Sequence, residues 1–217
     1  MSIIATVSIP EGIIMAADSR ITGITTCESE NGKQVDRHTI SDNGQKIFNI
    51  SKRIGISCCG DMRIGGVTIT EFMRNYEIEF CKEDITIEDC AKNLAAYTRL
   101  KGNKTNIIYH VCGYDNGKQL VYRVQGDDVT KVNDEYNMSR DGETAVLNNL
   151  ISGPIPLNLD LKNMYLKDGI EFAQFLVDVT CKTQRFSTGI PTCGGPIDIL
   201  LITKDEARWI KHKILNP

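Results

Sequence analysis

The second residue of the chain is a serine that directly follows the initiator methionine. Because the Ser2 side chain is small, we expect an aminopeptidase to remove Met1 and leave a free α-amine beside the Ser2 hydroxyl. An α-amine has a pKa of roughly 8, so it can be neutral at working pH and accept the hydroxyl proton itself. This nucleophile chemistry needs no histidine. The plainer interpretation is that Ser2 is only a common second residue.

Other kinds of reactive site are poorly supported by the residue types. The three histidines, His38, His110 and His212, lie far apart, and no C-x-x-C pair occurs among the eight cysteines, which argues against a zinc site. Most of the cysteines lie in apolar runs, and the chain shows no export signal, so we expect reduced core thiols. We expect neither a metal nor an organic cofactor.

The composition is that of an ordinary globular protein. The chain has 217 residues, of which 41% are hydrophobic and 24% charged, and it fits one domain over residues 1–217. A net charge of -3 without a basic stripe argues against a nucleic-acid partner. The N-terminus lacks the features of a signal peptide, and no apolar run is long enough to cross a bilayer. We therefore expect a cytoplasmic protein without membrane contact.

The elements that must position Ser2 begin with extended segments. Alternation and turn residues predict strands over 3–9, 13–17, 46–50 and 53–60, of which the last is expected to be buried on both faces. Residues 21–45 are polar and indicate a long excursion or hairpin. Apolar residues at helical spacing then predict helices over 69–80 and 86–97, the second with a capping pattern at Thr86.

The second half of the chain repeats this order. Asn116-Gly117 predicts a hairpin turn between two strands. Further patterns predict a strand over 129–132, helices over 142–151 and 168–182 with Asp168 as the cap of the latter, and strands over 196–203 and 207–213. Segregation of strands and helices predicts an α+β fold with mostly antiparallel strands, in which two sheets lie face to face and a helix pair covers each.

Four segments carry a resemblance to a known family. The segment GIIMAADSRITG resembles the "G-V-V-L-A-A-D-S-R-A-T-x-G" segment of proteasome β subunits and their bacterial relatives. In the same order, QKIFNISKRIGISCCGD, YHVCGYDNGKQLVYRV and CGGPIDILLIT are similar to later family segments. The chain therefore resembles a divergent, bacterial-type member of these N-terminal-nucleophile hydrolases, a threonine-protease family. The resemblance implies a four-layer αββα sandwich.

The same resemblance assigns roles to individual residues. It places Ser2 on the N-terminal nucleophile, Lys46 on the catalytic lysine and Asp18 on the aspartate that pairs with this lysine. It places Gly60 where the family has its oxyanion-binding N–H, before a helix whose N-terminus adds positive potential, and it gives Arg20 a supporting role. Without the resemblance, the plainer interpretation of Asp18 and Lys46 is a structural ion pair. For Gly60, it is a glycine that the strand end needs only for its conformation.

Two positions depart from the family pattern. Ser139 matches the serine that hydrogen-bonds near the amine, but Met138 and Arg140 flank it where the family has glycines. Ile190 and Cys193 stand where the family has an aspartate and a serine that support the nucleophile. These replacements place the rate of the reaction, and activity itself, in question.

The resemblance also implies a pocket and partners. The family's first specificity pocket maps to Ile21, Phe48, Cys58, Met62 and Gly66, which predicts a preference for apolar residues before the scissile bond. The polar segment near residues 25–43 is longer than in the family and is interpreted as a solvent-exposed hairpin, with the lining of a chamber entrance or a ring contact as the alternatives. Family members form rings, so we expect a homo-oligomeric ring, and the resemblance allows a partner ATPase.

Three functions follow from these observations. The first is an endopeptidase that uses Ser2 to cut peptides or unfolded protein chains. The second is a non-catalytic, ring-forming subunit, which the residues at 190 and 193 favour. The third is a related amidase or transpeptidase that acts on a non-standard substrate.

Overall fold

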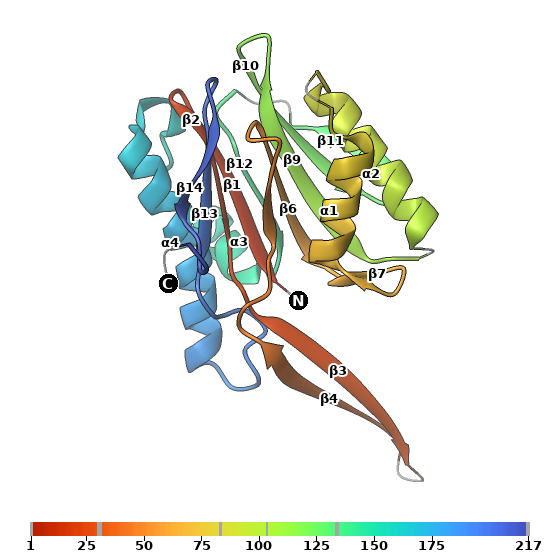
Figure 1. Ribbon diagram of the computed structural model, residues 1–217. Helices are drawn as coiled ribbons and strands as arrows, with labels where there is room; N and C mark the ends of the chain where they lie inside the picture. Colours follow the sequence, from red (N-terminus) through yellow and green to blue (C-terminus); the bar gives the residue numbers. More distant parts are fainter. Residues whose placement is uncertain (1, 30–31, 83, 103, 133–134, 216–217) are drawn as a thin grey trace.

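Two five-stranded antiparallel sheets form the centre of the protein (Figure 1). The computed structural model describes all residues except 1, 30–31, 83, 103, 133–134 and 216–217. The first sheet has the order β12-β1-β2-β13-β14. Its strands are β1 (Ile3–Ile9), β2 (Gly12–Ala17), β12 (Met138–Gly142), β13 (Asp198–Ile202) and β14 (Ala207–Lys211). The second has the order β11-β10-β9-β6-β5. Its strands are β5 (Ile47–Ile50), β6 (Ile54–Gly60), β9 (Ile107–Asp115), β10 (Lys118–Gln125) and β11 (Asp128–Lys131).

Two helices cover the outer face of each sheet. The helices α1 (Ile69–Phe80) and α2 (Ile87–Lys101) lie on the second sheet, and α3 (Ala145–Ser152) and α4 (Leu166–Phe186) lie on the first (Figure 1). A short 3-10 helix, η1 (Leu161–Asn163), precedes α4. The structure is therefore the predicted four-layer αββα sandwich with antiparallel sheets.

Burial follows these layers and fixes the direction of each side chain in β1. All seven residues of β1 are buried. Ile3, Ala5 and Val7 pack with the residues of α3 and α4, whereas Ile4 belongs to the apolar cluster between the two sheets. Because side chains alternate along a strand, Ser2, Thr6 and Ser8 share the face of Ile4. A serine at position 2 is thereby directed toward the second sheet.

Several local predictions are confirmed. Strand β6 is buried on both faces up to its last residue. Helix α2 begins after Thr86, whose Oγ1 accepts the N–H of Asp89 at 3.1 Å. Asn116 and Gly117 have φ angles of 50° and 74°, as a tight hairpin turn requires, and they join β9 to β10.

Three predictions were wrong in detail. Strand β12 was not predicted, because its sequence MSRDG is polar and shows no alternation. Helix α4 begins at Leu166, so Asp168 is not its cap; the Asp168 carboxylate instead accepts the N–H of Tyr165 at 3.2 Å. Gly60 does not precede a helix directly, since the short strands β7 (Arg63–Ile64) and β8 (Val67–Thr68) lie between it and α1.

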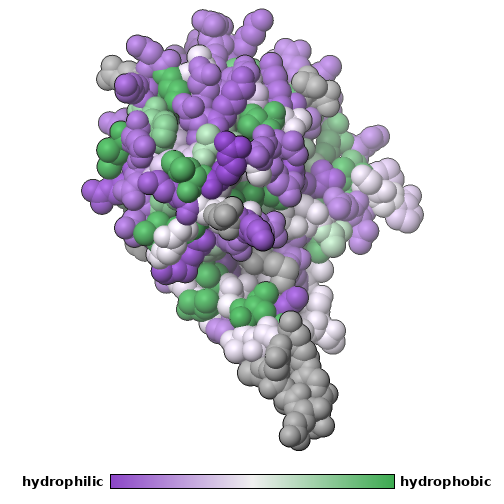
Figure 2. Space-filling view, turned by 90° about the vertical axis from the view of Figure 1, so that its right-hand side faces the viewer, coloured by the Kyte–Doolittle hydropathy of each residue, from purple (hydrophilic) through white to green (hydrophobic). Residues whose placement is uncertain are grey.

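The polar segment after β2 is a hairpin, as predicted. It consists of β3 (Ile21–Ser29) and β4 (Gly32–Ser41), which pair with each other and project from the body (Figure 1). On the side of the body where α1 and α2 lie, the surface is mostly hydrophilic, with hydrophobic residues scattered over it (Figure 2). Ile24, Val35 and Ile40 on this ribbon are exposed by 60%, 53% and 62%. The base of the ribbon and the N-terminal end of β1 lie at the same end of the sandwich (Figure 1).

Candidate active site

Ser2 is buried and is held through its backbone. The residue is 1% exposed, and its Oγ atom has no hydrogen-bond partner among the described residues. The N–H of Glu143 donates to the Ser2 carbonyl oxygen at 2.8 Å. Gly142 makes this approach possible, since a Cβ at that position would lie 1.9 Å from the Ser2 oxygen. Met1 lies outside the described residues, so its removal stays a prediction.

Asp18 and Lys46 form a buried ion pair next to Ser2. Asp18 follows β2 and Lys46 precedes β5, so each sheet supplies one partner. Lys46 Nζ lies 2.6 Å from Asp18 Oδ1, and both side chains are fully buried. The same Oδ1 accepts the N–H of Ile3 at 3.0 Å, which connects the ion pair to the residue after Ser2. The structure thus brings together the three residues on which the resemblance depends.

The second oxygen of Asp18 is also occupied. Asp18 Oδ2 accepts the N–H groups of Arg20 at 3.1 Å and of Gly194 at 3.0 Å. The Arg20 guanidinium donates to both oxygens of Asp42, at 2.7 and 2.9 Å, and to the carbonyl of Pro191 at 3.3 Å. This hydrogen bond from Arg20 holds the pKa of Asp42 below its usual range. Arg20 therefore fixes the chain segment that approaches Asp18, in agreement with a supporting role.

Gly60 ends β6 close to the segment that holds Ser2. A Cβ at Gly142 would lie 3.5 Å from the Cβ of Cys59, so the end of β6 reaches the Ser2 neighbourhood. Gly60 has a φ of 109°, and a Cβ there would lie 2.1 Å from the Asn106 carbonyl oxygen. Only glycine fits this position without strain. Because α1 begins at Ile69, no helix N-terminus adds its potential directly after Gly60.

Ser139 lies elsewhere. It pairs with Thr6 in the ladder between β1 and β12, four residues along β1 from Ser2. The structure therefore does not bring Ser139 to the Asp18–Lys46 pair. The match to the family serine rested on one residue. In the structure, the residues that reach Ser2 are Gly142, the last residue of β12, and Glu143, which follows it.

The five residues predicted to line a substrate pocket do not all face one cleft. Gly66 lies in the turn between β7 and β8, where a substrate contact stays a prediction. Phe48 and Cys58 are buried in the apolar cluster beneath α1 and α2, and Met62 packs against this cluster. Ile21 lies at the base of the ribbon, against Gly44. Phe48 and Cys58 thus serve the core, and a substrate contact stays a prediction for Ile21 and Met62.

Comparison with known proteins supports the architecture. No protein-family model matches the sequence. No curated protein matches it. Among solved structures, the chain is similar to the Gly-1 mutant of Anbu from Hyphomicrobium sp. strain MC1, with a TM-score of 0.65 and 11% identity over 98% of this chain and 86% of that chain. The likeness extends over nearly the whole chain, so the two proteins share the four-layer αββα fold.

Glu143, whose N–H contacts Ser2, belongs to a polar group that the sequence did not predict. Glu143 Oε1 lies 3.2 Å from Thr192 Oγ1, and Gln184 Oε1 accepts the N–H groups of Thr192 at 2.9 Å and Cys193 at 2.8 Å. Burial raises the pKa of the Cys193 thiol, which is therefore neutral. Ile190 is 48% exposed. Glu143 thus contacts Ser2 through its backbone N–H and the segment of Thr192 and Cys193 through its side chain.

The sequence analysis also missed a polar network between the sheets. Thr6 Oγ1 and His110 Nδ1 lie 2.9 Å apart, and His110 Nε2 lies 2.9 Å from Asp141 Oδ2. Arg123 donates to both oxygens of Asp141, at 2.8 and 2.9 Å. Asp141 precedes Gly142, so this network fastens the Ser2-binding end of β12 to β9 and β10. The sequence could not predict the partners of His110, because Thr6 and Asp141 come from strands that are distant along the chain.

None of the helices in the described part of the chain is long and apolar enough to cross a bilayer. The described residues also contain no group of three or more histidine, cysteine, aspartate or glutamate side chains that is arranged to hold a metal ion.

Proposed function

We propose that the protein is an N-terminal-nucleophile endopeptidase in which Ser2 attacks the peptide carbonyl after Met1 is removed. The observation that carries this proposal is the buried Ser2 hydroxyl, which has no hydrogen-bond partner among the residues that the structure describes. It lies beside a lysine–aspartate pair that is hydrogen-bonded to the next residue of the chain. A buried hydroxyl without a partner is costly, so its presence at this position favours a functional role.

The chemistry starts with the free α-amine of Ser2. The Lys46 ammonium lowers the pKa of a neighbouring amine, because a second positive charge nearby is unfavourable. The neutral amine accepts the hydroxyl proton while Ser2 Oγ bonds to the substrate carbonyl carbon. The Gly60 N–H stabilises the oxyanion that forms. The proton then passes to the leaving amine, and water hydrolyses the ester to release Ser2 Oγ.

The resemblance extends this proposal to the setting of the enzyme. We place the protein in the cytoplasm, in a homo-oligomeric ring that acts on peptides or unfolded chains, with a partner ATPase as an option. A non-catalytic ring subunit is the second candidate, and the exposed Ile190 and neutral Cys193 favour it.

One measurement separates the two candidates. The purified protein is incubated with an epoxyketone or β-lactone probe, and its intact mass and N-terminal residue are determined. Loss of Met1 together with an adduct on Ser2, absent in Ser2→Ala, supports the peptidase. Complete retention of Met1 without an adduct supports the non-catalytic subunit.

A further inference from the structure

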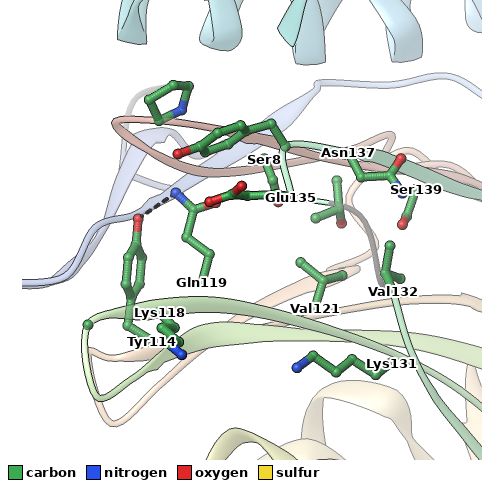
Figure 3. Close-up of a pocket in the computed structure, with 14 residues that line it drawn as sticks. Ser8, Tyr114, Lys118, Gln119, Val121, Lys131, Val132, Glu135, Asn137 and Ser139 are labelled. Atoms are coloured by element: carbon green, nitrogen blue, oxygen red, sulfur yellow. Dashed lines mark hydrogen bonds between the residues drawn. The ribbon is translucent and has the colours of Figure 1, made fainter. Parts of the chain in front are cut away.

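A cavity of about 430 Å³ lies between the two sheets, at the end of β1 opposite Ser2. Its walls come from β1, from the β9–β10 hairpin and from the segment before β12 (Figure 3). Thr6 and Ser8 line it from β1, and both are buried. A cavity of this size with several polar groups is typical of a small-molecule site.

The two lysines at the cavity do not direct their charges into it. Lys131 pairs with Tyr122 and Lys118 pairs with Asp115 in the strand ladders. Tyr122 donates to Glu88 of α2, and Asp115 accepts the N–H of Ile87, so these residues face the helices. Directly paired residues share a face of the sheet. Figure 3 accordingly shows Lys131 on the far side of β10, the strand that carries Gln119 and Val121.

An unpaired acceptor and a carboxylate do face the cavity. Gln119 Nε2 donates to the carbonyl oxygen of Ile9 at 2.7 Å and to the hydroxyl of Tyr114 at 3.0 Å. The opposite amide orientation would set two oxygens against each other at Ile9, so these contacts fix the Gln119 oxygen. That oxygen is buried and has no hydrogen-bond partner among the described residues. Glu135, which also lines the cavity, adds a carboxylate to it (Figure 3).

A buried acceptor oxygen and a carboxylate that line the same cavity are suited to a cation. The phenol rings of Tyr114 and Tyr136 also line the cavity, and aromatic faces attract ammonium groups. The hydroxyls of Thr6 and Ser8 offer further hydrogen bonds. We propose that this cavity binds a small primary ammonium compound with hydroxyl groups, its amine placed between the Gln119 oxygen and the Glu135 carboxylate. The proposal is independent of the chemistry at Ser2.

Glucosamine, glucose and N-acetylglucosamine are suitable probes, since they share a hydroxylated ring and differ in the amine. Binding to the full chain is measured by isothermal titration and by saturation-transfer NMR. We expect glucosamine to bind at least tenfold more tightly than either neutral sugar. Glu135→Gln is expected to weaken glucosamine binding at least tenfold, because it removes the negative charge.

Two variants complete the test. Glu171→Gln makes the same charge change on the exposed side of α4 and is expected to leave binding unchanged. Gln119→Leu is expected to weaken binding, and because Glu135 is exposed, Glu135→Gln decides the matter if Gln119→Leu does not fold. Equal binding of glucosamine and glucose, no binding of glucosamine, or unchanged affinity in Glu135→Gln would each overturn the proposal.

Discussion

Lys46 Nζ lies 2.6 Å from Asp18 Oδ1, and this contact joins the start of β5 to the end of β2 in a place that solvent does not reach. Removing Lys46 alone leaves a buried carboxylate without its counter-ion. We expect Lys46→Met to lower the free energy of unfolding by about 3–5 kcal/mol and to abolish labelling of Ser2 by an epoxyketone. Chemical denaturation and intact mass measure the two effects.

The double variant Asp18→Asn/Lys46→Met separates stability from chemistry. It removes both charges, so we expect it to regain much of the lost stability while labelling of Ser2 stays absent. Labelling at the normal rate in the stable double variant would show that Lys46 has no part in the reaction.

Gly142→Ala tests the contact that fixes the Ser2 backbone. The new Cβ would lie 1.9 Å from the Ser2 carbonyl oxygen, and the φ of 96° is itself unfavourable for alanine. Gly126→Ala is the matched control, because Gly126 has a φ of 60° and nothing within 4 Å of the added atom. We expect a loss of about 1–2 kcal/mol in the control and a larger loss, with slower labelling, in Gly142→Ala. Equal losses would mean that the Ser2 contact is unimportant.

The lowered pKa of Asp141 leads us to expect that the free energy of unfolding depends on pH. Burial alone would raise its pKa, but hydrogen bonds from His110 and Arg123 outweigh burial and hold the pKa below its usual range. Such a group contributes stability above its unfolded pKa of about 3.9, and this contribution is lost as the pH falls through the folded pKa. We expect Asp141→Asn to be less stable than the wild type at pH 7 and to lose less stability on acidification. Parallel slopes below pH 4 would contradict this.

Glu143 and Ser139 give opposite expectations. Glu143 holds the Ser2 carbonyl oxygen through its N–H, and its carboxylate lies 3.2 Å from Thr192 Oγ1, whereas Ser139 pairs with Thr6. Alanine keeps the N–H at position 143, so Glu143→Ala removes only the carboxylate that contacts Thr192. We expect this loss to slow labelling of Ser2, and we expect Ser139→Ala to label at the wild-type rate. The reverse result would restore Ser139 to the position that the resemblance gave it.

Much of the architecture could be predicted from local pattern. Strand β6 reads as a continuous apolar run, α2 carries its own cap at Thr86, and Asn116-Gly117 encodes a turn. Strand β12 could not be predicted, because its polar residues are paired by partners from other strands. For Asp141, those partners are His110 and Arg123.

The candidate site was predictable only where a motif carries it. Asp18 and Lys46 belong to extended segments that resemble the family, and the structure brings both to Ser2. Ser139 was a match of one residue, without the flanking glycines, and it was misplaced. Glu143, Gln184 and Thr192 meet through chain folding alone, so no local pattern could have found them.

The four hydrogen bonds to Asp18 restrict what this carboxylate can do. Oδ1 accepts from Lys46 and Ile3, and Oδ2 accepts from Arg20 and Gly194. A carboxylate has about four lone-pair positions, so none is left over. Asp18 is therefore a fixed counter-ion, and in the proposed reaction every proton must move through other groups. An Asp18→Asn chain would lose an anchor for three separate segments and would not lose a base.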